Sequence, residues 1–321
     1  MKFRALFIGI CLCLSHNSMA AEKTSIHIGV QASGTVDWEL TALQQAAQTE
    51  TASFKIDIQH VANPEAAKIA LQSGAVDMIV SDWIWVSRMR ANGTDFSFYP
   101  YSDTSGALVV PENSPIHSIA DLKGKRLGVA GGELDKNWLL MQALAQKSHV
   151  DLNKAVAKTF AAPPLISEQL KQNRIDAALT YWNFAVKLEA QGYREVIDGA
   201  GILKGLGINE TVPVLGYVFK QSWADSHKQA LLDFFAASKQ AKQTLCTDDN
   251  TWQKILPLTQ TDDAKTQAQL RQRYCAGSID NWGPTQQQAA EQIYSLLYKI
   301  SNKQLTGDVE HIQAGTFWSA Q

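Results

Sequence analysis

Two matching stretches decide the fold: Leu71-Gln-Ser-Gly-Ala-Val-Asp-Met-Ile-Val-Ser-Asp-Trp83 and Leu170-Lys-Gln-Asn-Arg-Ile-Asp-Ala-Ala-Leu-Thr-Tyr-Trp182. Their Leu, Asp and Trp recur at one constant offset along the chain, which Gly93 and Gly192 also keep. Each copy has the pattern of a helix end, a turn, an Asp, an apolar strand, an aromatic residue and the next helix. Helix–turn–strand units share composition, so chance similarity is the alternative. The constant offset favours two similar α/β lobes, each with an aromatic residue at the carboxyl end of a strand, where open α/β sheets bind ligands.

The sequence around the first copy alternates between short strands and amphipathic helices. Residues 54–61 alternate apolar and polar side chains with period two, as a half-buried strand does. Asn63 and Pro64 suit an N-cap and a first helical turn. We expect strands at 25–30, 54–61 and 78–80 and helices at 36–48, 63–73 and 83–92. This alternation predicts an α/β fold of mostly parallel sheets with flanking helices.

Two segments are expected to connect the lobes and to form a hinge. Residues 104–110 resemble a strand that leaves the first lobe, and residues 205–217 resemble the return. The part from 222 to 300 reads as helical, with apolar stripes at 231–235 and 293–300 that we interpret as core packing. The predicted organisation is a signal peptide at 1–20, the first part of lobe 1 at 21–105, lobe 2 at 106–205, and the return to lobe 1 with the C-terminal helices at 206–321.

The first twenty residues have the pattern of a secretory signal. Lys2 and Arg4 precede an apolar run, and the small residues Ser18 and Ala20 stand third and first before the expected cleavage site. We expect cleavage near Ala20 and a periplasmic location. A lipoprotein signal is disfavoured because leucine, not a small residue, precedes Cys13. An uncleaved anchor is disfavoured because the run is too short to span a bilayer.

Cysteine usage changes once such a signal is removed. Cys11 and Cys13 leave with it, and Cys246 and Cys275 remain. An even pair in an exported protein is best interpreted as one disulfide. Closing a loop of about 30 residues would stabilise the fold by roughly 3–4 kcal/mol. The alternative is two buried free thiols.

Composition bounds the classes of function. The chain has 321 residues, 45% of them hydrophobic, and 29 basic against 31 acidic side chains. That balance lacks the basic face of a nucleic-acid-binding protein, and no apolar run after the signal approaches the roughly 18 residues of a membrane span. Motifs of hydrolases, zinc enzymes, phosphate loops and dinucleotide sites are missing, and the histidines have no ligand spacing. We expect no enzyme activity, no metal, no cofactor and no nucleic-acid partner.

A family resemblance is carried by Ala120-Asp-Leu-Lys-Gly-Lys-Arg-Leu-Gly-Val129 together with Leu71, Gly74 and Asp77. With its two lobes and two crossings, the mature chain resembles type II periplasmic solute-binding proteins of ABC importers, in the group that binds nitrate, aliphatic sulfonates, taurine and thiamine pyrimidine precursors. The resemblance covers nearly the whole mature chain and specifies the fold better than the ligand. It implies a monomer whose lobes close around a small molecule, with a membrane permease and its ATPase as partners. The rival functions are an enzyme like the pyrimidine-precursor synthases and a periplasmic sensor without a permease.

Aromatic and polar residues at the expected strand ends are the candidate ligand contacts. Carboxylates beside aromatic faces suit an organic cation or a heteroaromatic ring with amino groups. A sulfonate, taurine or nitrate anion is the alternative; it needs charged or helix-start donors, and no arginine lies in these turns. For each tryptophan taken singly, core packing explains the residue as well. The candidate set is Trp38, Ser81, Asp82, Trp83, Thr104, Ser105, Gly132, Glu133, Trp138, Tyr181, Trp182 and Asn183.

Within this set we expect a clamp across the two lobes. Trp83 would hold the ligand from lobe 1, and Tyr181 with Trp182 would hold it from lobe 2. Asp82 and Glu133 would select its polar groups. The hydroxyl-bearing residues serve equally well as helix caps.

Overall fold

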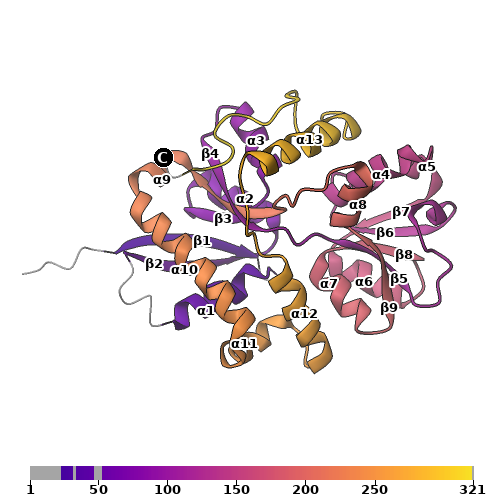
Figure 1. Ribbon diagram of the computed structural model, residues 1–321, viewed down its shortest axis with the longest axis horizontal. Helices are drawn as coiled ribbons and strands as arrows, with labels where there is room; N and C mark the ends of the chain where they lie inside the picture. The colour runs from indigo at the N-terminus through magenta and orange to yellow at the C-terminus, as the bar shows by residue number, and fades with distance from the viewer. Residues whose placement is uncertain (1–22, 32–33, 47–52, 320–321) are drawn as a thin grey trace, which may run out of the picture.

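Two lobes, each built on one five-stranded sheet, make up the computed structural model, which describes residues 23–31, 34–46 and 53–319 (Figure 1). The predicted signal peptide at 1–20 lies outside the described residues. The first sheet has the order β2-β1-β3-β10-β4 and contains β1 (Thr24–Gln31), β2 (Phe54–Val61), β3 (Met78–Ser81), β4 (Phe96–Ser102) and β10 (Leu215–Lys220). The second has the order β7-β6-β8-β5-β9 and contains β5 (Ala107–Pro111), β6 (Arg126–Ala130), β7 (Ala157–Ala161), β8 (Ala177–Thr180) and β9 (Tyr193–Asp198).

Helices flank both sheets (Figure 1). Lobe 1 carries α1 (Val36–Gln45), α2 (Pro64–Ser73) and α3 (Trp83–Ala91). Lobe 2 carries the short 3-10 helix η2 (Ile119–Leu122), then α4 (Lys136–Lys147), α5 (Leu152–Ala155), α6 (Pro163–Lys171), α7 (Trp182–Glu189) and α8 (Gly199–Leu206). The chain after β10 forms α9 (Gln221–Ser226), α10 (Lys228–Thr247), α11 (Asp249–Ile255), the 3-10 helix η3 (Leu256–Thr259), α12 (Ala264–Ala276) and α13 (Pro284–Ile300).

In each sheet four strands run in one direction, as the prediction of mostly parallel sheets requires. The fifth is antiparallel to both of its neighbours: β10 in the first sheet and β5 in the second. Both exceptions are the strands that follow a crossing between the lobes. The sheets are therefore mixed, because a strand that arrives from the other lobe enters from the carboxyl edge instead of through a crossover helix.

The repeated sequence forms the same structural unit in both lobes. In lobe 1 the carboxylate of Asp77 accepts a hydrogen bond from the backbone N–H of His27 on β1 at 2.9 Å. In lobe 2 the carboxylate of Asp176 accepts one from the N–H of Arg126 on β6 at 2.8 Å. Each Asp stands just before β3 or β8, away from the carboxyl ends of these strands. The repeated Asp therefore ties two neighbouring strands together and has a structural role.

The chain crosses between the lobes twice. It leaves the first sheet at Ser102 and enters the second at Ala107, and it returns between Leu206 of α8 and Leu215 of β10. The two crossings lie side by side where the N–H of Val214 donates to the carbonyl oxygen of Ser102 at 2.8 Å. Two adjacent segments that connect separate sheets are a natural place for a hinge.

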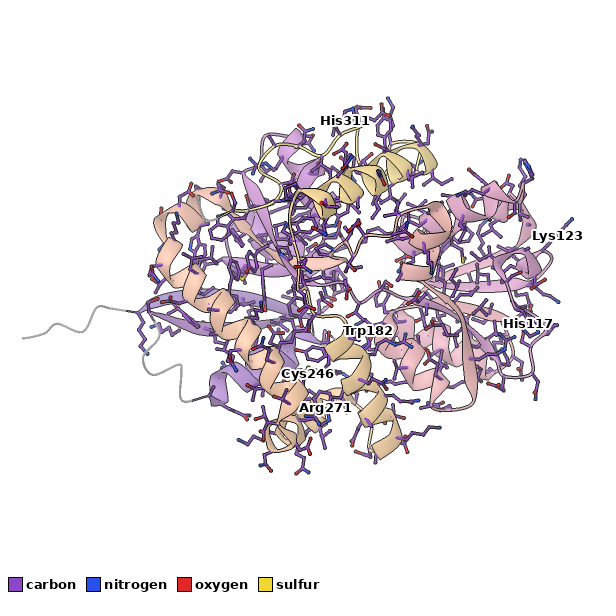
Figure 2. The ribbon with its side chains drawn as sticks, in the orientation of Figure 1. His117, Lys123, Trp182, Cys246, Arg271 and His311 are labelled. Atoms are coloured by element: carbon purple, nitrogen blue, oxygen red, sulfur yellow. A yellow bond between two sulfur atoms is a disulfide. The ribbon has the colours of Figure 1, made fainter. Side chains whose placement is uncertain are left out.

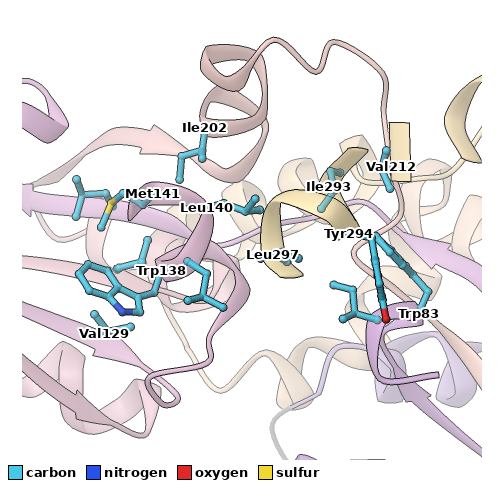
Figure 3. Packing of buried hydrophobic residues seen from close by; sticks show 14 of the residues in the cluster. Trp83, Val129, Trp138, Leu140, Met141, Ile202, Val212, Ile293, Tyr294 and Leu297 are labelled. Atoms are coloured by element: carbon cyan, nitrogen blue, oxygen red, sulfur yellow. The ribbon is translucent and has the colours of Figure 1, made fainter. Parts of the chain in front are cut away.

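One hydrophobic cluster is shared by both lobes (Figure 3). It contains Trp83 at the start of α3 in lobe 1, Trp138 and Leu140 of α4 in lobe 2, and Ile293 and Leu297 of α13. Helix α13 follows the return to lobe 1, yet it packs against α4 of lobe 2. The C-terminal helices thus help to hold the two lobes together.

The predicted disulfide is confirmed. Cys246 at the end of α10 and Cys275 at the end of α12 are bonded, with their Cα atoms 5.7 Å apart. The bond joins the C-terminal ends of α10 and α12. Within the described parts of the chain, every helix is too short or too polar to cross a bilayer.

Candidate functional site

A cavity of about 490 Å³ lies between the lobes. This volume falls within the range of about 300–1,000 Å³ that is usual for small-molecule sites. Its walls come from the starts of α3, α4 and α8, from both crossings, and from α13. The lining residues are Trp83, Ile84, Asp103, Ser105, Lys136, Asn137, Leu140, Gly199, Ala200, Gly201, Leu203, Lys204, Ile208, Asn209, Glu210, Thr211, Val212, Pro213, Val214, Ile293 and Leu297.

One group of polar side chains in the cavity lies where the first crossing meets α4 and α8. Asp103 and Ser105 belong to the crossing, and Asn137 belongs to the first turn of α4. The N–H of Gly199 donates to the carbonyl oxygen of Gly106 at 3.0 Å, which joins the start of α8 to the same crossing. The acidic side chain of Asp103 and the uncharged side chains of Ser105 and Asn137 therefore line the same wall.

Apolar side chains form much of the remaining wall. Leu140 of α4 and Leu203 of α8 come from lobe 2, and Ile208 comes from the return crossing. Ile293 and Leu297 of α13 complete this wall (Figure 3). The cavity is therefore amphipathic. Besides the polar residues at the first crossing, polar side chains of α8 and the return crossing lie among the branched aliphatic ones: Lys204, Asn209, Glu210 and Thr211.

An ion pair between the lobes lies at the cavity. The ammonium Nζ of Lys136 is 3.0 Å from Oδ2 of Asp82, which also caps α3 by accepting from the N–H of Trp85 at 2.9 Å. Burial alone would raise the pKa of Asp82, but Lys136, Lys68 and the cap bond outweigh burial and lower it. Burial alone would lower the pKa of Lys136, but Asp82 and Asp135 raise it above its usual value. The charge of Lys136 is thus compensated by the protein itself.

Two acidic residues line the cavity, Asp103 on the first crossing and Glu210 on the return crossing. Among the described residues Asp103 takes part in no ion pair, although Lys242 acts on it electrostatically. Burial raises the pKa of Asp103, and the negative charges of Asp280 and Asp198 raise it further against the opposing effect of Lys242. The polar wall therefore carries a carboxyl group that Lys242 compensates only in part.

Only two of the twelve predicted contacts line the cavity, Trp83 and Ser105. Trp83 is 2% exposed, donates from Nε1 to the carbonyl oxygen of Pro213 at 2.8 Å, and packs on Tyr294 and Phe317. Its indole joins α3, the return crossing and α13. Trp83 is thus both a core residue and part of the cavity wall.

The structure places the other predicted tryptophans in the packed interior. Trp138 is 1% exposed and packs on Phe160. Trp38 of α1 and Trp182 of α7 meet edge to face across the lobes, with ring centroids 6.1 Å apart. Trp83 and Trp182 lie in separate hydrophobic clusters, and the lobe 1 ring that Trp182 contacts is that of Trp38. The clamp of Trp83 and Trp182 stays a prediction.

The remaining predicted residues lie near the ends of strands and do not line the cavity. Asp82 and Ser81 are buried at the end of β3, and the hydroxyl of Thr104 lies 2.7 Å from that of Ser102. Tyr181 is 37% exposed, Gly132 and Glu133 are exposed, and Asn183 is half-buried on α7.

Sequence reasoning missed Asp103, Lys136, Asn137 and the residues of α8 and α13. Asp103 directly precedes Thr104, which the sequence did single out, so including the neighbouring residue at that strand end would have found it. The residues of α13 gave no such signal, because an apolar stripe looks the same whether it faces a core or a cavity.

Two five-stranded α/β lobes that enclose a cavity at a double crossing define the two-lobed binding-protein class. Residues 50–250 match the family model described as NMT1/THI5 like, and the chain belongs to that family. A protein of Escherichia coli (strain K12) whose name refers to binding aliphatic sulfonates is 27% identical over 199 residues. The match covers 60% of this chain, and the chain spans 60% of the length of that relative.

Solved structures share the fold. The alkanesulfonate-binding protein SsuA from Xanthomonas axonopodis pv. citri, bound to MOPS, superposes with a TM-score of 0.71 at 18% identity, over 94% of this chain and 100% of the other. The periplasmic aliphatic sulphonate binding protein SsuA from Escherichia coli gives 0.72 at 18% identity, over 92% and 98%. The periplasmic nitrate-binding protein NrtA from Synechocystis PCC 6803 gives 0.53 at 12% identity, over 75% and 66%. At these identities the likeness concerns the fold.

Proposed function

We propose that this protein is the exported substrate-binding component of an ABC importer and captures a small organic molecule between its lobes. The observation that carries the proposal is the cavity at the double crossing, which is lined from both lobes. Family membership and the names of the relatives support it. The signal-like N-terminus and the disulfide support export to the periplasm. The partners would be a permease and its ATPase, and the protein itself would act as a monomer.

The mechanism follows from where the cavity lies. Lys136 and Asn137 reach it from lobe 2, and Trp83 reaches it from lobe 1. A solute that touches both lobes binds the closed state better than the open one, and it shifts the equilibrium by that difference in affinity. The permease would then recognise the closed form. This mechanism binds and releases the solute and requires no chemical reaction by any side chain.

The cavity favours an amphipathic solute whose polar group is an amine or an amino-substituted heteroaromatic ring. Asp103 supplies a carboxyl group that has no ion-pair contact among the described residues, while Lys136 already pairs with Asp82. The other two charged residues of the lining, Lys204 and Glu210, have opposite signs. An amine would lie against Asp103, Ser105 and Asn137, with its apolar part along Leu140. The alternative is a sulfonate-type anion, which the names of the relatives favour and which would use the N–H groups at the start of α8.

A binding screen separates these two solute classes. Thermal-shift assays and calorimetry of the mature protein are made with alkylamines, aminopyrimidines, alkanesulfonates, taurine and nitrate. If an amine binds, Asp103→Asn should weaken it about tenfold or more, since a charge-assisted hydrogen bond is lost. Asp151→Asn, an exposed helix cap in lobe 2, is the matched control. Tight binding of an alkanesulfonate that Asp103→Asn leaves unchanged would support the anion instead.

Two results would contradict the proposal as a whole. Turnover of a bound solute would favour an enzyme of the synthase type. A solute receptor without any permease and ATPase encoded beside it would favour a periplasmic sensor. If none of the five solute classes shifts the melting temperature of the protein, both the amine and the sulfonate-type anion are excluded as its solute.

A further inference from the structure

Helix α12 stands between the two lobes (Figure 1). It packs against α10 of lobe 1 on one side and against α7 of lobe 2 on the other. The Cys246–Cys275 disulfide fixes its C-terminal end to α10; Cys246 is labelled in Figure 2. Leu270 and Tyr274 are buried in the cluster that contains Trp38 of lobe 1 and Trp182 of lobe 2. The covalent bond to α10 therefore keeps α12 with lobe 1.

One side chain of α12 reaches across to lobe 2. The Nη1 of Arg273 is 2.9 Å from Oε2 of Glu195 on β9, and its Nη2 is 3.3 Å from Oε2 of Glu189 on α7. The three side chains are between 20% and 30% exposed. The guanidinium therefore lies between two partly buried carboxylates of the other lobe, where ion pairs are screened less than at an open surface.

The positive charge of Arg273 offsets the repulsion between the carboxylates of Glu189 and Glu195. Burial raises the pKa of Glu189, Arg273 opposes that rise, and the charge of Glu195 adds to it. Without Arg273 two like charges would face each other and the surface of α12. The contact therefore favours the arrangement in which lobe 2 lies against α12.

We propose that Arg273 is a positioning residue outside the cavity that latches lobe 2 to disulfide-anchored α12 and thereby sets the affinity of the cavity for its solute. The proposal rests on solute binding as the function. When only the closed fraction of a protein binds well, the apparent dissociation constant rises as that fraction falls. Loss of the latch lowers the closed fraction while every side chain of the cavity stays in place.

The test compares two arginines of the same helix. Arg273→Gln removes the contact between the lobes. Arg271→Gln is the matched control, because Arg271 bonds to Leu245 and Asp249, both on the lobe 1 side. Small-angle scattering of the ligand-free full-length mature protein measures the separation of the lobes without any solute. We expect a larger radius of gyration for Arg273→Gln alone and an intermediate value for Arg273→Lys, which keeps the charge but loses the two-pronged geometry.

Binding is measured in parallel with n-hexylamine and n-hexanesulfonate as probes. Whichever probe binds the unaltered protein should bind Arg273→Gln about 5- to 20-fold more weakly and Arg271→Gln normally. A radius of gyration that is equal in Arg273→Gln, Arg271→Gln and the unaltered protein would overturn the latch. Equal affinity of Arg273→Gln and the unaltered protein for a bound probe would overturn the control of affinity by the latch. If scattering separates the variants and neither probe binds, Arg273 still holds the lobes together, and it is the proposed solute class that fails, so the two failures are distinguishable.

Discussion

Two glycines at the junction of the lobes have no room for a side chain. A Cβ on Gly199 would come within 2.5 Å of the Cβ and Oγ atoms of Ser105, and a Cβ on Gly106 would collide with the carbonyl oxygen of Thr180. The Oγ of Ser105 can rotate away, but the Cβ of Ser105 and the carbonyl oxygen of Thr180 are both fixed to the backbone. Neither clash can therefore be relieved by side-chain rotation alone.

We expect Gly106→Ala and Gly199→Ala each to lower the free energy of unfolding by about 1–3 kcal/mol. Gly132→Ala is the control, because nothing lies within 4 Å of a Cβ at that position. Urea unfolding of the three variants measures the difference. Equal stability of Gly106→Ala and Gly132→Ala would show that the junction relaxes freely.

The contribution of Asp176 to the stability of the fold depends on pH. The side-chain hydrogen bond from Arg126 lowers the pKa of Asp176 from its ordinary value of 3.8, against the smaller effect of burial. A lowered folded-state pKa means that the ionised form stabilises the fold above the unfolded-state value, and that this contribution is lost as the pH falls through the folded-state value.

Asp176→Asn should therefore cost about 1 kcal/mol at pH 7, a modest figure because the Arg126 pair is half exposed. We expect the deficit to shrink steadily as the pH falls below about 4. Urea titrations of both proteins between neutral and acid pH give the two curves. A deficit that stays constant across this range would exclude the carboxylate as its source.

At the scale of elements, α13 serves two purposes at once. Its buried face contributes Tyr294 to the stack with Trp83, and the same face presents Ile293 and Leu297 to the cavity. Helix α12 is likewise shared, between the disulfide on one side and the ion pairs of Arg273 on the other. Elements that follow the last strand therefore do more than complete the core of lobe 1.

The disulfide gives a prediction at this scale. Cys246 and Cys275 are 29 residues apart in sequence, a loop whose closure removes about 3–4 kcal/mol of unfolded-state entropy in the chain model. We expect the Cys246→Ala/Cys275→Ala protein to be less stable than the oxidised protein by about that amount. Urea unfolding of the variant, and of the native chain with and without reductant, measures it. If reductant also lowers the stability of the variant, which has no disulfide, then the loss of stability has a cause other than the Cys246–Cys275 bond.

At the scale of the whole molecule, the lobes touch on both sides of the crossings. Asp82 pairs with Lys136 at the cavity, and Trp38 meets Trp182 near α12. Opening the molecule would separate both contacts and expose the indole of Trp182, which is 7% exposed when the lobes meet. The position of Trp182 makes it an internal reporter of closure.

Addition of a bound solute should shift the tryptophan emission to the blue and lower the radius of gyration, as the closed fraction rises. Trp182→Phe should remove most of the optical signal while the scattering change remains. Trp252→Phe is the control, because Trp252 packs on Trp38 from the lobe 1 side at a centroid distance of 5.6 Å. An undiminished blue shift in Trp182→Phe would place the reporter elsewhere.

The sequence by itself determined the features that depend on order along the chain. The constant offset between Asp77 and Asp176 marked two equivalent units, because each unit uses its Asp for the same strand-to-strand bond. The two cysteines that remain after a signal allow a single pairing, so the disulfide needed no three-dimensional information. Alternating periodicity was enough for an α/β fold of two lobes.

Only the tertiary structure decided what the cavity contains. Asp103, Asn137 and Leu297 come from segments that are far apart in sequence, and the side that each presents depends on how α4 and α13 pack on the crossings. Apolar periodicity says that a helix has a buried face, but it does not say whether protein or a solute covers that face. For the same reason Trp138 could not be separated from Trp83 in advance: both follow strands, and packing alone made one a core residue and the other part of a cavity wall.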